Sequence, residues 1–199
     1  YINYRFIGPN LSDIKRDCNP IMKSASLQDP SLYSYHQWLS SFYTEDGKTI
    51  YAFIHNEEYG SKAYVPCTGA FDGDQSCLYN AITLAISTDG GKSYNPAAEP
   101  PANLIASSPY PFVAGAGPYG FFNPSNIIKG NDGYYYVYMR EHFYQQGGNV
   151  AAICLMRTKN LADASSWRAW DGSDFTVVFI NPYLKPDEAK SAPQCVSIP

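Results

Sequence analysis

The sequence predicts an all-β protein, and three observations lead to this prediction. Aromatic residues make up 16% of the 199 residues, with 18 tyrosines among them, and aromatic side chains favour strands. The 15 glycines and 15 prolines divide the chain into short segments, as expected where turns join many strands. The same order of apolar runs and Asp-Gly turns also occurs twice, and Asp-Gly between apolar runs is a strong hairpin signal.

The first copy of this unit begins with a strand predicted over residues 35–43. The Asp-Gly turn at residues 45–48 leads to a second strand over residues 50–57, and a long loop leads to a third over residues 80–86. Each segment is apolar or tyrosine-rich and is bounded by turn residues, which is typical of strands. The first unit is therefore expected to form antiparallel hairpins.

The second copy repeats this order with different loop lengths. Its strands are predicted over residues 120–128, 134–141, 150–157 and 174–180. An Asp-Gly turn at residues 130–133 joins the first two strands, and Trp167 is the expected closing aromatic after the third. Four antiparallel strands per unit are typical of a propeller blade, and a blade needs neighbours to bury its faces.

The stretch Ser87–Tyr94 follows the third strand of the first unit and reads Ser-Thr-Asp-Gly-Gly-Lys-Ser-Tyr. An aspartate at the position of Asp89 accepts hydrogen bonds from backbone N–H groups of a turn, and Gly91 supplies a positive φ. Tyr94 is expected to pack under the turn and to anchor the next strand. Together with Ser87, these residues predict a structural turn, for which an ordinary hairpin turn is the alternative interpretation.

This turn resembles the Asp-box of sialidases and other β-propellers, which joins the two outer strands of a blade. Five further runs are similar to sequences of uncharacterised secreted proteins that resemble sialidase-like and five-bladed glycoside-hydrolase propellers. These runs lie at residues 35–38, 55–57, 78–85, 121–126 and 166–172. The resemblance implies a propeller fold and a carbohydrate-related role. It implies no particular activity, because enzymes and binding proteins share the Asp-box.

Two blades do not close a ring, which needs at least about four. We therefore expect a β-propeller fragment of a larger, five- or six-bladed ring. Residues 1–30 would end a preceding blade, residues 31–108 and 109–185 would each form a blade, and residues 186–199 would begin the next. An additional chain or a missing segment would complete the propeller. A Greek-key sandwich is the competing architecture, which accounts for the strands but not for the repeat.

Composition and charge exclude several classes of function. The net charge is −4 and no cluster of lysine or arginine occurs, which argues against a nucleic-acid partner. No apolar stretch approaches the ~20 residues that span a membrane. The cysteine spacing does not suggest zinc, and nothing indicates a cofactor. A Cys67–Cys77 disulfide would close a loop, and Asn10-Leu11-Ser12 is a glycosylation sequon, so an extracellular, secreted protein is expected.

Propellers bind ligands at one end of the central channel, where the inner strands begin. The inner strands are expected at residues 35–43 and 121–128. The polar and aromatic residues near their starts are His36, Gln37, Trp38, Asn123 and Asn126. Amide and imidazole groups hydrogen-bond sugar hydroxyls, and a tryptophan offers an apolar stacking face. These residues are predicted to bind substrate, with a simple turn as the alternative interpretation of residues 123–126.

The ends of the second strands supply the remaining candidates. Subtracting 84 aligns Glu141 with Glu57 and Arg140 with Asn56, so both strands end in a carboxylate beside a polar residue. Glycoside hydrolysis uses two carboxylates, separated by ~5–5.5 Å or ~6.5–9.5 Å. Glu57 and Glu141 are therefore the predicted catalytic pair. An ion pair at residues 140–141 and a solvated loop edge at residues 57–58 are the alternatives.

His55, Asn56 and Arg140 are predicted to bind substrate near this pair. His55 is expected to be a hydrogen-bonding residue, since no second ligand lies at metal spacing. The predicted function is that of a glycoside hydrolase-like protein acting on an extracellular polysaccharide or glycan. The alternative is a non-catalytic propeller that binds carbohydrate or protein, either lectin-like or as a structural surface protein. The fold alone does not choose between them.

Overall fold

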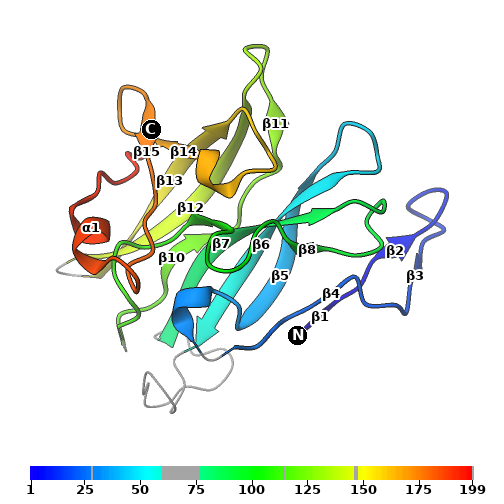
Figure 1. The fold of residues 1–199 in the computed structure, drawn as a ribbon, viewed down its shortest axis with the longest axis horizontal. Helices are drawn as coiled ribbons and strands as arrows, with labels where there is room; N and C mark the ends of the chain where they lie inside the picture. Colours follow the sequence, from blue (N-terminus) through cyan, green and yellow to red (C-terminus); the bar gives the residue numbers. More distant parts are fainter. Residues whose placement is uncertain (28, 60–76, 114, 146–147, 199) are drawn as a thin grey trace.

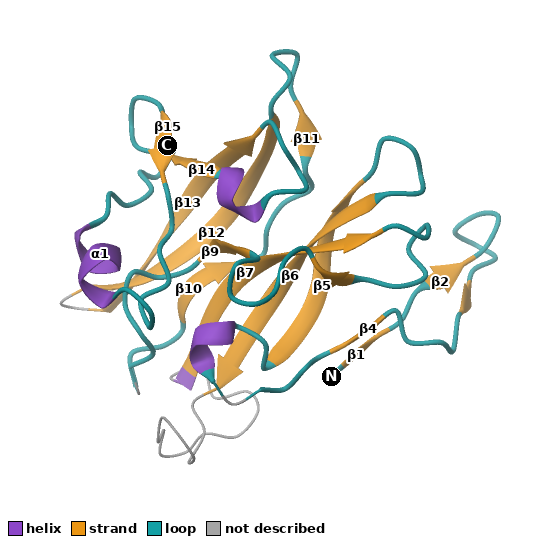
Figure 2. Ribbon diagram, viewed as in Figure 1, coloured by secondary structure: helices purple, strands orange, loops and turns teal. Residues whose placement is uncertain are grey.

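The structure is a computed structural model that describes residues 1–27, 29–59, 77–113, 115–145 and 148–198. These residues form fifteen strands, the short helix α1 (Pro186–Ser191) and two 3-10 turns. Strands fill the centre of the molecule, and the helix α1 lies at its periphery (Figure 2). The prediction of an all-β protein is confirmed. No helix among the described residues is long and apolar enough to span a membrane.

Eleven of the described strands form one sheet, and the other four form two small two-stranded sheets near the N-terminus (Figure 1). The strands are β1 (Ile2–Asn3), β2 (Phe6–Ile7), β3 (Lys15–Arg16), β4 (Met22–Lys23), β5 (His36–Tyr43), β6 (Ile50–Tyr59), β7 (Leu78–Ser87), β8 (Asn95–Pro96), β9 (Leu104–Ala106), β10 (Tyr119–Phe122), β11 (Ile128–Lys129), β12 (Tyr135–Gln145), β13 (Gly148–Thr158), β14 (Arg168–Trp170) and β15 (Phe175–Val177). The order across the large sheet is β15-β14-β13-β12-β10-β7-β6-β5.

The first unit is the antiparallel meander β5-β6-β7, as predicted, with β8 and β9 along the outer edge of β7. Its Asp-Gly turn forms because the carboxylate of Asp46 accepts hydrogen bonds from the backbone N–H groups of Lys48 and Thr49, at 2.8 and 2.7 Å. Gly47 adopts a φ of 70° in this turn. The local turn chemistry thus sets the register of the first hairpin.

The second unit follows the predicted order with two differences. Its first strand, predicted over residues 120–128, is interrupted between β10 and β11. Asn123 has a φ of 46° in this interruption, a conformation that asparagine tolerates. The strand β14 is an addition, and the strand predicted over residues 174–180 is the shorter β15, with which β14 pairs.

The stretch Ser87–Tyr94 forms the predicted structural turn between β7 and β8. The carboxylate of Asp89 accepts hydrogen bonds from the backbone N–H groups of Lys92 and Ser93, at 2.9 and 3.0 Å. The Ser87 hydroxyl donates to the same carboxylate and accepts from the N–H of Gly91. Tyr94 is buried beneath the turn.

The two units are joined by β10, which pairs in parallel with β7 and antiparallel with β12. Gly120 lies in this short strand with a φ of 106°, and a Cβ atom there would overlap the carbonyl oxygen of Asn80. Only glycine fits this close approach. Because β10 is shared, the described strands form a continuous sheet with β5 and β15 at its edges, and no closed ring occurs among them.

The main core lies between the two units. Phe53 and Leu84 from the first unit contact a surface of the second unit that includes Val137 and Met139. The ring of Trp167 lies 5.2 Å from that of Phe53 in an edge-to-face arrangement, a favourable geometry for aromatic pairs. All five side chains are buried, so this interface is the largest apolar cluster of the fold.

The hairpin registers show that the second strands of the two units are offset by 85 residues. Tyr43 pairs with Tyr51 in the first hairpin, and Ile128 pairs with Tyr136 in the second. The predicted alignment of Glu57 with Glu141 is therefore wrong by one residue. A slip of one residue moves every side chain of a strand to the other face, so the counterpart of Glu141 is Asn56, and that of Glu57 is His142.

A disulfide joins Cys154 of β13 to Cys195 and fixes the C-terminal segment against the second unit. Two backbone hydrogen bonds support the same contact, from Val196 N–H to the carbonyl of Trp170 and from Ile198 N–H to that of Ile153. The expected Cys67–Cys77 bridge involves a residue outside the described ranges.

Replacing Phe53 with alanine should destabilise the protein by about 3–5 kcal/mol, because it opens a cavity in the core between the units. Urea unfolding followed by tyrosine and tryptophan fluorescence measures this change. Phe6→Ala is the matched control, since Phe6 is 62% exposed and its loss should cost less than about 1 kcal/mol. Equal effects of the two substitutions would contradict this assignment of the core.

Replacing Asp89 with alanine should lower the Tm by several degrees, because two backbone N–H groups and two hydroxyls lose their acceptor. The same hydrogen bonds lower the pKa of Asp89. The ionised form is therefore favoured in the fold, and its stabilisation should disappear as the pH falls below the ordinary aspartate range. Circular dichroism melts of Asp89→Ala and of the exposed control Asp13→Ala test this; coincident curves would exclude the role given to Asp89.

Candidate ligand-binding site

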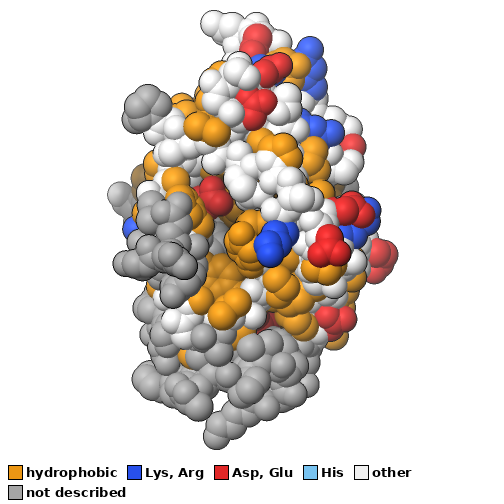
Figure 3. All heavy atoms as spheres, turned by 90° about the vertical axis from the view of Figure 1, so that its left-hand side faces the viewer, with side chains coloured by type: hydrophobic (Ala, Val, Ile, Leu, Met, Phe, Trp, Pro, Cys, Tyr) orange, Lys and Arg blue, Asp and Glu red, His pale blue; other side chains and the backbone are white. Residues whose placement is uncertain are grey.

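A cavity of about 660 Å³ lies at one end of strands β10 and β12, beside the C-terminal segment. One wall is the loop between β9 and β10, another is Glu141 and Phe143 of β12, and a third is Lys190 of α1 with Gln194. Figure 3 views this side of the molecule, where hydrophobic side chains cover a broad area. The volume falls in the range of small-molecule sites.

A cluster of buried tyrosines holds the loop between β9 and β10 in position. The hydroxyl of Tyr119 donates to the carbonyl of Pro111 and accepts from the N–H of Val113, both at 2.6 Å. The hydroxyl of Tyr183 accepts from the N–H of Phe112 at 2.9 Å. Burial raises the pKa of both tyrosines, so their hydroxyls stay protonated and keep these contacts at physiological pH.

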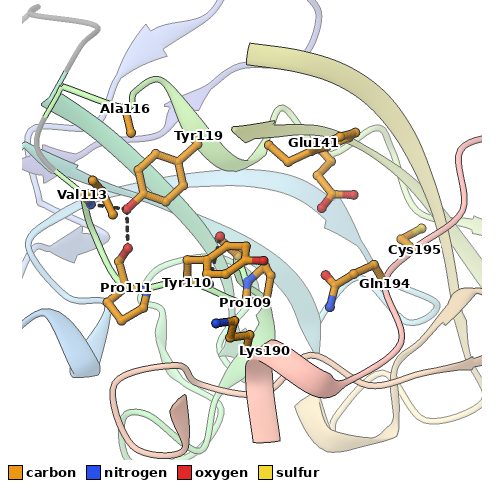
Figure 4. A pocket seen from close by; sticks show the side chains of 12 residues that line it. Pro109, Tyr110, Pro111, Val113, Ala116, Tyr119, Glu141, Lys190, Gln194 and Cys195 are labelled. Carbon is orange, nitrogen blue, oxygen red and sulfur yellow. Dashed lines mark hydrogen bonds between the residues drawn. The ribbon is translucent and has the colours of Figure 1, made fainter. Parts of the chain in front are cut away.

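Glu141 is the polar centre of the cavity. Its side chain points into the open space (Figure 4) and is only 5% exposed. Its carboxyl makes no hydrogen bond and no ion pair within the described part of the chain. Desolvation by burial raises the pKa of Glu141 to about 7, so protonated and ionised forms coexist near neutral pH.

Two further polar side chains of the cavity come from the C-terminal segment. The amide of Gln194 and the carboxyl of Glu141 project into the same space, and Lys190 extends beside Tyr110 (Figure 4). The disulfide of Cys195 and the backbone bonds after it hold this segment in place. Segments far apart in sequence therefore build one pocket with polar side chains and aromatic walls.

Two of the predicted substrate-binding residues have structural roles instead. Gln37 donates a 3.1 Å hydrogen bond to Asn56. The amide of Asn56 in turn donates to the carbonyls of Ile54 and Ala81 and to the hydroxyl of Thr83. Both side chains are buried, so their polar groups are committed to the sheet.

The structure brings together the predicted residues His36, Trp38, His55 and Glu57. His36 pairs with Glu57, and Trp38 pairs with His55, so all four side chains lie on one face. The ring of Tyr1 lies 3.9 Å from that of His36 and 4.7 Å from that of Trp38. Burial lowers the pKa of His55, and the charge of Glu57 partly opposes this shift.

Glu57 and Glu141 are not brought together. Glu57 is in register with Asn80, Asn80 with Gly120, and Gly120 with His142. The side chain of Glu57 therefore lies on the face of His142, and Glu141 points to the opposite face. Three strand spacings of ~4.8 Å separate the two backbones by about 14 Å. A direct carboxylate pair between them is incompatible with this arrangement.

The other predicted residues lie outside the cavity. Asn123, Asn126 and Arg140 are exposed, and Arg140 lies on the face of β12 opposite to Glu141. Ser41 of β5 donates its hydroxyl to the carbonyls of Pro124 and Ser125. These hydrogen bonds agree with the alternative interpretation of residues 123–126 as a turn.

Sequence reasoning missed the aromatic wall and the C-terminal polar groups of the cavity. The run Ser108–Phe112, which alternates proline with aromatic residues, is the signal that would have indicated the wall. Nothing in the sequence connects Gln194 or Lys190 to Glu141, because they meet only in the fold, where the Cys154–Cys195 disulfide holds the C-terminal segment against the second unit. No group of three or more histidine, cysteine or acidic residues suited to a metal occurs among the described residues.

Comparisons of this chain with protein-family models, with curated proteins and with solved structures found no match.

Replacing Glu141 with glutamine should make stability less dependent on pH. The raised pKa means that the folded state binds the proton more tightly than the unfolded chain, so wild-type stability falls as the pH rises from about 4.5 to about 7. Glutamine carries no charge, and Glu141→Gln should exceed wild type by on the order of 3 kcal/mol at about pH 8 and match it near pH 4. Urea unfolding at both pH values measures this; parallel pH curves would contradict an uncompensated buried carboxyl.

Proposed function

We propose that this protein binds carbohydrate in the Glu141 cavity. The observation that carries the proposal is a single buried carboxyl surrounded by apolar and aromatic walls. Aromatic faces suit the C–H faces of sugar rings, and Tyr110 is half exposed at the rim. Glu141, Gln194 and Lys190 supply donors and acceptors for hydroxyl groups. Few polar groups in a mostly apolar pocket are typical of small-ligand sites.

Binding without hydrolysis is the better supported form of this function. Glycoside hydrolysis requires two carboxyl groups across the scissile bond. Of the described residues that line the cavity, Glu141 is the one with a carboxyl group, and Glu57 lies on the other face of the sheet. The site therefore has the features of a lectin-like pocket.

Hydrolysis is retained as a second candidate because of one observation. A carboxyl with a pKa of about 7 suits a general acid that protonates a leaving oxygen near neutral pH. Under this alternative, Glu141 is the general acid. The base or nucleophile is a second carboxylate, which is not one of the described residues that line the cavity. Release of new reducing ends from a bound oligosaccharide, abolished by Glu141→Gln, distinguishes hydrolysis from binding alone.

We also propose that the two units are adjacent blades of a sialidase-like propeller. The face of β6 that carries Phe53 packs on the face of β12 that carries Met139, and Met139 is the counterpart of Ile54, on the opposite face of β6. The contact is thus front to back, as between successive blades. The Asp-box turn supports the same assignment. The Cys154–Cys195 disulfide and the exposed sequon at Asn10 support an extracellular location.

Tyr110→Ala should weaken glycan binding at least about tenfold, which is about 1.4 kcal/mol, because it removes an aromatic surface from the rim. A glycan array identifies the ligand, and calorimetry measures the affinity. Tyr138→Ala is the matched control, since Tyr138 is similarly exposed but lies on the opposite face of β12 from Glu141. Absence of binding to any glycan, or equal losses in both variants, would contradict the proposed pocket.

A further inference from the structure

We propose that the ligand of the Glu141 cavity carries a cationic amine, which binds the ionised carboxylate of Glu141. For a carbohydrate ligand, this means an amino sugar with a free amino group. The sugar part of this inference rests on the proposed function. The charge of the ligand is inferred independently, from how Glu141 is surrounded.

The carboxyl of Glu141 has no ion-pair partner among the described residues. Other acidic side chains form ion pairs at the surface, such as Asp17 with Arg5 and Asp174 with Arg157. Glu141 is 95% buried and has no such partner among the described residues. A buried carboxylate is costly unless an opposite charge or hydrogen-bond donors compensate it. The cavity in front of Glu141 is where a ligand would supply that compensation.

The strands and wall residues nearest to Glu141 present uncharged side chains. On the neighbouring strands, Phe121 of β10 and Ala152 of β13 are in register with it, and neither is charged. The loop between β9 and β10 contributes Ser108 and Tyr110, β10 contributes Tyr119, and the C-terminal segment contributes Gln194. These side chains leave the negative charge of Glu141 without a cationic neighbour.

Among the described residues, Lys190 is the one cationic side chain that lines the cavity. It is exposed and lies beside Tyr110, away from Glu141 (Figure 4). Burial raises the pKa of Glu141. Lys190 therefore does not occupy the space in the cavity beside the carboxyl of Glu141, and a ligand can enter it.

The aromatic wall of the cavity also favours a cationic ligand. Ammonium groups are attracted to the faces of aromatic rings, and aromatic pockets recognise quaternary ammonium compounds. Tyr110, Tyr119 and Phe143 line the cavity that Glu141 enters. A carboxylate combined with aromatic rings favours a desolvated organic cation over a neutral polyol, which has no charge to balance that of Glu141.

The test compares three probes in calorimetry at about pH 7: a glucosamine trimer with free amines, its fully N-acetylated form, and choline. The variant is Glu141→Gln, which keeps the size of the side chain and removes its charge. The matched control is Glu57→Gln, on the opposite face of the sheet. We expect the free amine to bind at least about tenfold more tightly than the acetylated trimer. Glu141→Gln should abolish this preference and the binding of choline, and Glu57→Gln should change neither.

Proton release supplies a second readout. A bound cation ionises Glu141, so choline binding should release a proton at about pH 6 and none at about pH 8.5, since free Glu141 is already ionised there. The affinity for choline should rise over the same interval. Thermal melts of each variant show that binding differences do not arise from unfolding.

The outcomes separate this inference from the proposed function. Equal binding of both trimers, unaffected by Glu141→Gln, would overturn the cationic ligand and leave a carbohydrate pocket. Binding of choline through Glu141, with neither trimer bound, would support the cationic ligand and count against the amino sugar. Failure of all three probes to bind would overturn the inference altogether.

Discussion

The packing of the two units against each other is the constraint on which the rest of the structure depends. Phe53 and Trp167 lie at its centre, and the other buried side chains of the interface come from nearly every strand of the large sheet. Neither unit could bury this surface alone, because each is a single layer of strands. The short strand β10 carries the chain between the units, and the conformation of Gly120 allows it to pair with both.

The cavity is a consequence of this arrangement. Along one face of β12, the side chains of Val137, Met139 and Glu141 follow one another in alternate positions. The first two belong to the interface, and Glu141 lies one step beyond it. The loop from β9 must pass over this end of the sheet to reach β10, and its tyrosine contacts hold it away from the carboxyl. The disulfide at Cys195 brings the third wall into place.

Local chemistry made much of the fold predictable from the sequence. The Asp-Gly turns, the tyrosine-rich second strands and the turn at Asp89 depend on near neighbours, and all were predicted correctly. The register was not predictable in this way. An offset of 84 residues relates His36 to Gly120. Between Phe122 and Ile128 the chain has two residues more than the partner strand opposite, whereas the bulge at Ser41 adds only one, so the second strands are offset by 85. This single residue separated the predicted carboxylate pair and left Glu141 in a different site.

Stability alone does not account for Glu141. The alternation before it continues a buried apolar face, where a leucine or methionine would complete the pattern without the cost of a buried carboxyl. A carboxyl with a raised pKa and no partner weakens the fold at neutral pH. Such a residue is typical of sites where a group is kept ready for a ligand or a proton. The cavity in front of Glu141 has aromatic walls and the charged Lys190 at its rim. Binding of a ligand is therefore the better explanation for a carboxyl at this position.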